Sequence, residues 1–451
     1  MQYILNDKAS VPVSNIEFTV GAKVVVASHE QTLTPGYVSI RDGRITRVAD
    51  TCESCNLFFE QAAILPSLIN AHTHLEFSDL EKPIAAGDSF PDWIGRVVAY
   101  RRQQLDASTD VVDARRRAAI QQGLRESFKT GTGLLADIVT PPWSPDYLQF
   151  AADRPRADLL EYFGGILDQN KAASASPQHP LVIALPEIIG MERERLKASL
   201  DWAEGLNTPP PDEHKQVLKS LGISPHSPYT IDFSTFTRAD QQPAIREPVA
   251  MHLAESVEEL QWLRERRGPF ADAFQRLGVQ PPDQLPSIQE CLQFLAKYRS
   301  LIVHGNYLTM EQMRWIGDHR NLSVVYCPRT HSYFGHAPYP LQEMQNSGIR
   351  VVLGTDSRAS SPDLNMWSEL RHLRKCQPWM SPNQALKIAT TASADALGCS
   401  ADVGCIATGK LAFLSIAKLQ PQEQPGELLE RISLEETEIN NLADLFDSSD
   451  S

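Results

Sequence analysis

The stretch Leu65-Pro-Ser-Leu-Ile-Asn-Ala-His-Thr-His-Leu-Glu76 places two histidines shortly after an apolar run. The run from Ala63 to Ile69 predicts a fully buried strand. Because side chains two residues apart on a strand point to the same side, His72 and His74 present both imidazoles in one direction. That arrangement suits two ligands of one divalent metal ion, although an isolated pair of this kind is more often two polar residues in a turn. Further ligands elsewhere in the chain therefore decide between the two interpretations.

Seven more strand-like segments follow, separated by segments with helical periodicity. This alternation predicts parallel strands joined by crossover helices. With the first strand they make eight βα units, which close naturally into a TIM barrel whose chemistry lies at the carboxyl ends of the strands. A ninth candidate, Ala157–Gly165, is assigned instead to an insertion. The seven predicted strands are Gly131–Val139, Leu181–Gly190, Leu218–Ser224, Pro248–Leu253, Leu301–His304, Leu322–Cys327 and Arg350–Leu353.

Polar side chains stand at the carboxyl ends of four further predicted strands. His226 follows the fourth strand, His252 ends the fifth and Glu255 lies three residues beyond it; His304 ends the sixth, and Asp356 follows the eighth. Taken singly, each histidine is more typical of a core or loop imidazole that is hydrogen-bonded to the protein. Together with the histidine pair of the first strand, these residues predict a metal site in the barrel mouth.

Short strand-like runs at the two ends of the chain predict a second, smaller unit. Four runs lie between residues 16 and 48, and Asp42-Gly43 between the last two is a strong signal of a tight hairpin. Because so few strands are not stable alone, we expect them to pair with the β-rich segment Gly404–Ile416. The expected division is an N-terminal part at 15–62, the barrel at 63–395, a C-terminal part at 396–433 and a solvated acidic tail at 434–451 with a short helix through Leu442, Leu445 and Phe446.

Composition limits the partners. The net charge of −14 argues against nucleic acid or an anionic membrane as a partner, since both require a basic face. No apolar run approaches the roughly 20 residues of a membrane span, and Asp7 and Lys8 interrupt the start of the chain, which is unlike an export signal. The seven scattered cysteines fit reduced thiols in a cytoplasm. We therefore expect a cytoplasmic protein that acts on a small molecule.

The motifs HTHLE, SPHSPYT, HLAES, VHGN, CPRT and LGTDS, in this order, resemble the amidohydrolase superfamily. The resemblance covers about 24–416 and is closest to the branch that contains nucleobase and nucleoside deaminases and triazine chlorohydrolases. The strings HTHLEFS and YCPRTHSYFGH are most similar to a group that includes aminodeoxyfutalosine deaminases. The resemblance implies an α/β fold, a metal-dependent (β/α)8 TIM barrel with a small composite β-sandwich built from both termini.

The resemblance also implies one divalent metal ion that activates water for hydrolysis. Zn²⁺ fits three imidazoles and a carboxylate best, and Fe²⁺ is the alternative. Dinuclear members carry a modified lysine at the end of the fourth strand, where this chain has Ser224-Pro-His226. The implied ligands are His72, His74, His252 and Asp356, and the implied catalytic residues are Glu255 as general acid/base, His304 as a second proton-handling or oxyanion-orienting group, and Asp356.

The implied reaction is hydrolytic deamination of an adenine nucleoside of the aminodeoxyfutalosine, S-adenosylhomocysteine or methylthioadenosine type. The alternatives are hydrolysis of another C–N or C–Cl bond, as in guanine, cytosine or triazine rings, and a catalytically silent barrel. Relatives are often oligomeric, so a homo-oligomer is possible. Arg101 and Arg102 are interpreted as solvated surface residues. The implied substrate-binding residues are His226 near the reacting carbon, Glu76 at ribose hydroxyls, Trp93 against the sugar or its 5′ substituent, and Arg329 and Arg358 at a substrate carboxylate.

Overall fold

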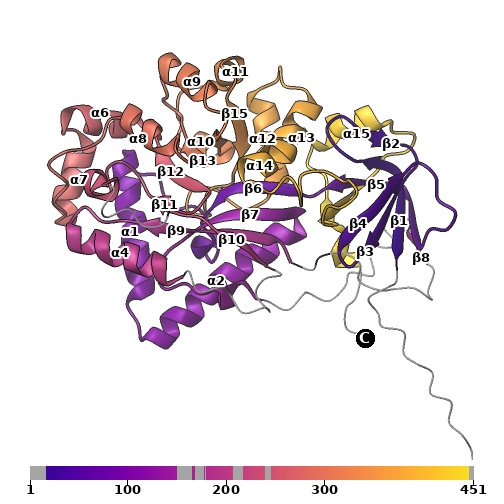
Figure 1. Cartoon of the computed structure of the whole chain (residues 1–451), viewed down its shortest axis with the longest axis horizontal. Coiled ribbons are helices and arrows are strands. Elements are labelled where there is room, and N and C mark those ends of the chain that lie inside the picture. Colours follow the sequence, from indigo (N-terminus) through magenta and orange to yellow (C-terminus); the bar gives the residue numbers. More distant parts are fainter. Residues whose placement is uncertain are drawn as a thin grey trace, which may run out of the picture.

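The computed structural model describes residues 17–149, 165–167, 177, 179–206, 217–238 and 245–445. Within them the chain forms a large α/β part and a smaller β-rich part that lie side by side (Figure 1). The predicted insertion Ala157–Gly165 lies outside the described residues except for Gly165.

Eight strand positions follow one another around the α/β part in chain order, as predicted. Two parallel sheets run β10-β9-β7-β6 and β12-β13-β14-β15, with β11 paired to β9. Isolated parallel bridges, Thr73 to Asp356 and Ile223 to Val249, join the two sheets at both edges. The circuit is that of a (β/α)8 barrel. Two short strands, β10 (Leu218–Leu221) and β11 (Ser224–Pro225), share the fourth position. The other seven positions are β6 (Leu68–Thr73), β7 (Thr132–Val139), β9 (Leu181–Ile188), β12 (Val249–Leu253), β13 (Ser300–His304), β14 (Leu322–Tyr326) and β15 (Arg350–Leu353).

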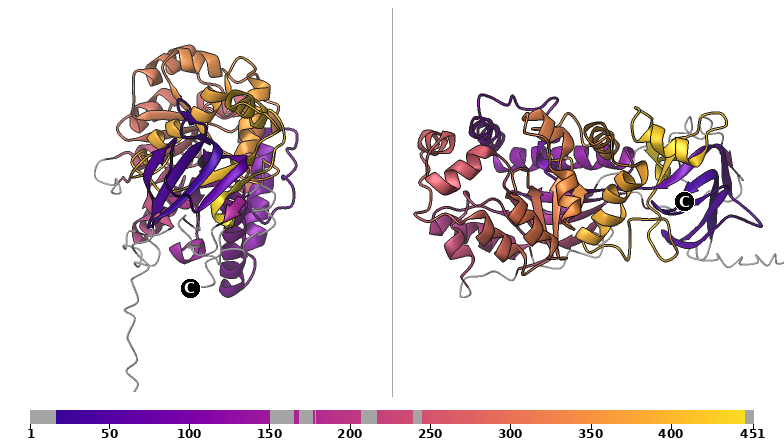
Figure 2. Two further views of the ribbon diagram at one scale, coloured as in Figure 1. Left: turned by 90° about the vertical axis from the view of Figure 1, so that its right-hand side faces the viewer. Right: turned by 90° about the horizontal axis from the view of Figure 1, so that it is seen from above.

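Helices surround the barrel strands (Figure 2). One of them, α1 (Phe90–Leu105), begins where Ser89 caps its first turn by accepting a hydrogen bond from the Asp92 backbone amide. Among the described residues, no helix is both long and apolar enough to cross a bilayer. The other helices are α2 (Thr109–Lys129), α4 (Arg193–Gly205), α5 (Phe233–Phe236), α6 (Val257–Glu265), α7 (Pro269–Leu277), α8 (Ile288–Leu295), α9 (Met310–Gly317), α10 (Pro328–Tyr333), α11 (Leu341–Asn346), α12 (Met366–Cys376), α13 (Pro382–Ala389), α14 (Thr391–Ala396) and α15 (Pro425–Ile432), with 3-10 turns at η2 (Leu75–Phe77) and η3 (Pro145–Leu148).

The predicted first strand, Ala63–Ile69, is in fact divided between two elements. Its first half ends β5 (Leu57–Pro66), which pairs antiparallel with β16 (Leu414–Lys418) in the β-rich part. Its second half begins β6, which pairs with β7 in the barrel. The apolar run is continuous because both halves are buried, so periodicity alone does not mark the boundary at Ser67.

The β-rich part combines both ends of the described chain, as predicted. Its sheet runs β17-β16-β5-β1-β3-β4, with β2 and β8 paired to β1 and β5. Asp42 and Gly43 have φ values of +50° and +70°, the left-handed pair that the β3–β4 hairpin requires. Arg44 bridges to Leu411 just before β16, so the sheet curls back on itself around one apolar core. The remaining strands are β1 (Phe18–Val26), β2 (Thr32–Leu33), β3 (Gly36–Arg41), β4 (Arg44–Ala49) and β8 (Gly165–Leu167).

The predicted solvated tail is wrong for residues 439–443. Strand β17 (Ile439–Asn441) pairs antiparallel with β16, and Leu442 and Ala443 are buried. A 3-10 turn, η5 (Leu442–Leu445), replaces the expected amphipathic helix, and Phe446 lies outside the described residues. The acidic residues of this segment lie beside the apolar positions that the sheet needs, which charge counting does not reveal.

Candidate active site

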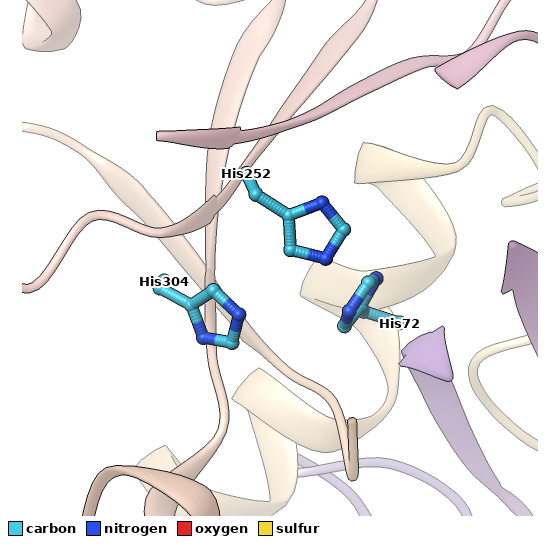
Figure 3. Close-up of side chains that lie close together, drawn as sticks. All are labelled: His72, His252 and His304. Atoms are coloured by element: carbon cyan, nitrogen blue, oxygen red, sulfur yellow. The ribbon is translucent and has the colours of Figure 1, made fainter. Parts of the chain in front are cut away.

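Histidines from three barrel strands converge at the barrel mouth (Figure 3). His72 comes from β6, His252 from β12 and His304 from the end of β13, and one nitrogen of each lies within 4.8 Å of the others. A second group with the same spacing joins His72 to His74 and Asp356. Apart from the pair His72 and His74, the five residues lie far apart in the sequence, and they meet because parallel strands end on one face of the barrel.

Asp356 faces the first histidine pair across the closing edge of the barrel. Its Oδ1 lies 3.6 Å from His72 Nε2 and 3.7 Å from His74 Nε2. Its other oxygen, Oδ2, accepts a hydrogen bond of 2.6 Å from the Ser360 hydroxyl. The Thr73 hydroxyl donates to the Asp356 backbone carbonyl at 3.0 Å, so the strand that carries the histidines also fixes the carboxylate.

The donor atoms fit a divalent cation. Both ring nitrogens of His72 are buried and neither has a hydrogen-bond partner in the described part of the chain, although buried polar atoms are normally paired. Burial lowers the pKa of His74, with His72 adding to the effect, and burial and His72 do the same to His252. His252 Nδ1 lies 3.1 Å from the His226 carbonyl oxygen, which leaves its Nε2 facing the site. Neutral imidazoles and one carboxylate are the ligand set of catalytic zinc.

Glu255 and His304 form a close pair beside these donors. Glu255 Oε1 lies 3.3 Å from His304 Nε2. Burial raises the pKa of Glu255, and the charges of Asp356 and Glu259 raise it further, so this carboxyl is suited to holding a proton. The backbone amide of Glu255 donates to the buried Glu259 carboxylate at 2.7 Å. Ala254, His304 and Asp356 have φ values of +53°, +69° and +57°, a strained conformation for residues other than glycine that clusters at functional sites.

A cavity of about 580 Å³ opens above these residues, within the range of roughly 300–1,000 Å³ found for small-molecule sites. Its floor is polar and its outer wall is largely apolar, with the wall drawn mainly from α1 and the α7 region. The floor residues are His74, His226, His252, Glu255, His304 and Asp356, and the apolar wall includes Phe90, Trp93, Ile94, Val97, Phe274 and Leu277.

Two of the predicted substrate residues, His226 and Trp93, line this cavity. The Trp93 ring also packs against Phe90 and Phe334, with ring centroids 5.7 and 4.9 Å apart. Its indole nitrogen donates to the Ala359 carbonyl at 3.4 Å. Trp93 is therefore both an apolar anchor of α1 and part of the cavity wall, so the two interpretations of this residue are compatible.

Glu76 does not line the cavity. Its side chain is buried and accepts hydrogen bonds from Arg101 at 2.6 Å, from Thr140 at 3.0 Å and from Arg116. Oε2 accepts two of these hydrogen bonds and Oε1 accepts one, so protein donors occupy most of the acceptor positions of the carboxylate. A ribose hydroxyl at Glu76 would compete with these donors.

Arg329 and Arg358 are also absent from the residues that line the cavity, so the described side chains give no support to their predicted contact with a substrate carboxylate. Arg329 forms ion pairs with Glu369 at 2.6 Å and with Asp363 at 2.8 Å. Arg358 donates to both carboxylate oxygens of Glu126, at 2.9 and 2.8 Å. Each follows a strand end, but helix residues that approach from elsewhere in the chain neutralise both guanidinium groups.

Two charged residues of the site were not predicted. Arg101, interpreted as solvated, lines the cavity wall and links Glu76 to Glu187. Glu187 stands on β9, and burial raises its pKa while Arg101 and His72 oppose that shift. Glu187 could have been predicted from the sequence, because it is a polar residue near the carboxyl end of a predicted barrel strand. No local signal distinguishes Arg101 from a surface arginine.

Comparisons with known proteins agree with this architecture. The profile described as "Amidohydrolase family" matches residues 63–449. An aminodeoxyfutalosine deaminase of Nitratiruptor sp. is 26% identical over 371 residues, which cover 80% of each chain. A 5-methylthioadenosine/S-adenosylhomocysteine deaminase of Pyrococcus furiosus is 24% identical over 426 residues, covering 90% of this chain and 88% of that one. The crystal structure of an adenosine deaminase from Xanthomonas campestris with bound zinc superposes with a TM-score of 0.64 at 20% identity, over 91% of this chain and 88% of that one.

Proposed function

Since this chain belongs to the amidohydrolase family, we propose that it is a hydrolytic deaminase of an adenine nucleoside. The observation that carries the proposal is the convergence of buried imidazoles, Asp356 and Glu255 on the floor of a cavity with an apolar wall. Relatives named as deaminases of aminodeoxyfutalosine and of methylthioadenosine or S-adenosylhomocysteine support the choice of an adenine nucleoside.

His72, His74, His252 and Asp356 would hold one divalent cation, and we propose zinc because a zinc-bound structure shares the fold. A cation there supplies Lewis-acid activation of water at neutral pH. The protein's own contribution is to keep the imidazoles neutral by burial and to fix the carboxylate through Ser360. Such hydrogen bonds around a ligand set its orientation and its basicity.

Glu255 is the proposed general acid/base. Deamination needs one group that accepts a proton from water and delivers a proton to the ring, and burial together with the charges of Asp356 and Glu259 raises the pKa of the Glu255 carboxyl, which favours its holding that proton. His304 lies 3.3 Å from Glu255, and burial lowers its pKa; we assign it the role of orienting this carboxyl and of hydrogen-bonding the oxygen that adds to the ring. We assign Asp356 the role of accepting a hydrogen bond from the attacking water.

The apolar cavity wall favours a nucleoside with a 5′ substituent, rather than a free base, as the substrate. The cavity of about 580 Å³ is lined by apolar side chains of α1 and α7 in addition to the polar floor, and we assign the ribose and its substituent to this apolar lining. Trp93 and Phe90 offer aromatic faces on this wall. Arg101, Arg102 and Arg195 also border the cavity, so the wall tolerates a negatively charged substituent.

The test is ammonia release by the zinc-loaded protein with adenosine, methylthioadenosine, S-adenosylhomocysteine and aminodeoxyfutalosine. We expect turnover of at least one and a clear preference among them. The matched control is Glu255→Gln, which preserves the shape of the side chain and should retain the metal but lose turnover. Silence toward all four nucleosides with metal bound would refute the proposal, and release of ammonia or chloride from a base or a triazine would identify the alternative hydrolase.

A further inference from the structure

A chain of alternating charges runs from the outside of the barrel to its mouth. Arg116 and Thr140 donate to Glu76, Glu76 accepts from Arg101, and Arg101 approaches Glu187. The proposed reaction assigns no role to the last member, Glu187, although its Oε1 lies 3.6 Å from His226, a residue of the cavity floor. A buried charged group of this kind requires a partner for each of its oxygens.

The two oxygens of Glu187 have different surroundings. The side chain is 1% exposed, and its Oε2 lies 3.5 Å from Arg101 Nη1. Its Oε1 is buried and has no hydrogen-bond partner in the described residues. The ring nitrogen Nε2 of His226 lies 3.6 Å from this oxygen. A modest movement of the two side chains therefore makes a hydrogen bond in which His226 donates to Glu187.

His226 is held on its other side by a hydroxyl. Its Nδ1 lies 2.8 Å from Thr230 Oγ1, and a neutral imidazole carries its proton on only one of its two nitrogens. If Nε2 carries the proton, the Thr230 hydroxyl donates to Nδ1 and gives up its 3.2 Å hydrogen bond to the Ser227 carbonyl. If Nδ1 carries it, Nε2 presents a lone pair to the Glu187 carboxylate, which leaves the buried oxygen without a donor and places two acceptors face to face.

We propose that Glu187 is a positioning residue that holds His226 in the tautomer protonated on Nε2. The inference rests on the proposed function, in which His226 contacts the substrate. In that tautomer His226 is a hydrogen-bond donor at the cavity floor, where its side chain is 22% exposed. An acceptor atom of the substrate can then replace Glu187 as the partner of the Nε2 proton. Arg101 keeps the carboxylate in place from the opposite side.

The direct test observes the tautomer and needs no substrate. Nitrogen NMR of labelled protein distinguishes protonated from unprotonated ring nitrogens, and the His226 signals are assigned by their disappearance in His226→Asn. We expect Nε2 to be protonated in the wild type and the proton to shift toward Nδ1 in Glu187→Gln, whose amide can donate to Nε2. Protonation of Nδ1 in the wild type would overturn the inference, even if the protein deaminates nucleosides.

A double-mutant cycle tests the consequence for activity. Glu187→Gln should lower kcat/KM about tenfold, equivalent to about 1.4 kcal/mol, with the metal content unchanged, and should have no further effect in a His226→Asn background. Glu194→Gln, which removes an exposed charge of α4 whose side chain does not line the cavity, is the control that should leave kcat/KM unchanged. Additive losses in the double variant would show that Glu187 does not act through His226. If Glu187→Gln does not fold, Glu187→Asp serves in the same cycle, because it keeps the charge but withdraws the carboxylate from His226.

Discussion

Replacing Arg329 with methionine should destabilise the fold by about 3–4 kcal/mol without impairing substrate binding. The change removes a guanidinium that is only 11% exposed and leaves Glu369, which is fully buried, without its charged partner. Removing one partner of a buried ion pair costs about 3–5 kcal/mol. The lower part of that range applies because Glu369 keeps a 3.0 Å hydrogen bond from the Arg329 backbone amide, and the second partner, Asp363, is 38% exposed.

The assay is urea unfolding of the metal-loaded protein, combined with KM for the best nucleoside. The matched control is the double variant Arg329→Met/Glu369→Leu, which removes both charges together and should recover most of the lost stability, because well-packed apolar residues often replace a buried pair without loss. A loss of less than 1 kcal/mol in the single variant would refute this reasoning. A tenfold rise in KM with unchanged unfolding would instead restore Arg329 as a substrate-binding residue.

Further predictions concern the site itself. Glu255→Gln should lower kcat by about 10²–10⁴, the usual contribution of general acid/base catalysis, while elemental analysis shows the metal retained. His252→Ala should abolish metal binding and His304→Ala should leave most of it, as measured by the metal-to-protein ratio; the reverse result would exchange the roles of these two histidines. Ser360→Ala removes the 2.6 Å hydrogen bond to Asp356 and should weaken metal affinity about 10–100-fold in competition with a chelator. Trp93→Leu should raise KM more for nucleosides with a large 5′ substituent than for adenosine, and an equal effect on both would argue against this part of the wall as the site of the substituent.

Much of the barrel, and the convergence of the proposed metal-binding residues, could be predicted because the relevant sequence patterns are local. A strand exposes alternate side chains on one side, so His72 and His74 face the same way wherever the strand lies. The carboxyl ends of parallel strands share one face of a barrel, so His252 and Asp356 could be placed in the same mouth from their positions alone. The Asp42-Gly43 hairpin follows from backbone sterics and needs no tertiary information.

The partners of charged side chains were decided only by the tertiary structure. Arg329 and Arg358 follow strand ends just as the metal-binding residues do, yet Glu369 and Glu126 neutralise them from helices distant in the sequence. Glu76 and Arg101 were expected to face a substrate and the solvent respectively, but they face each other.

In the acidic C-terminal segment, the tertiary structure decided the pairing of the backbone as well. Residues 439–441 form an edge strand because the backbone amides and carbonyls of β16 pair with them. The sequence of residues 439–441 alone does not predict that β16 lies beside them. The sequence by itself therefore determined the direction in which the side chains of each strand point, because this direction depends on the backbone geometry of neighbouring residues. Tertiary structure decided which polar groups remain free for chemistry, because each is satisfied or left unsatisfied by groups that only folding brings within hydrogen-bonding distance.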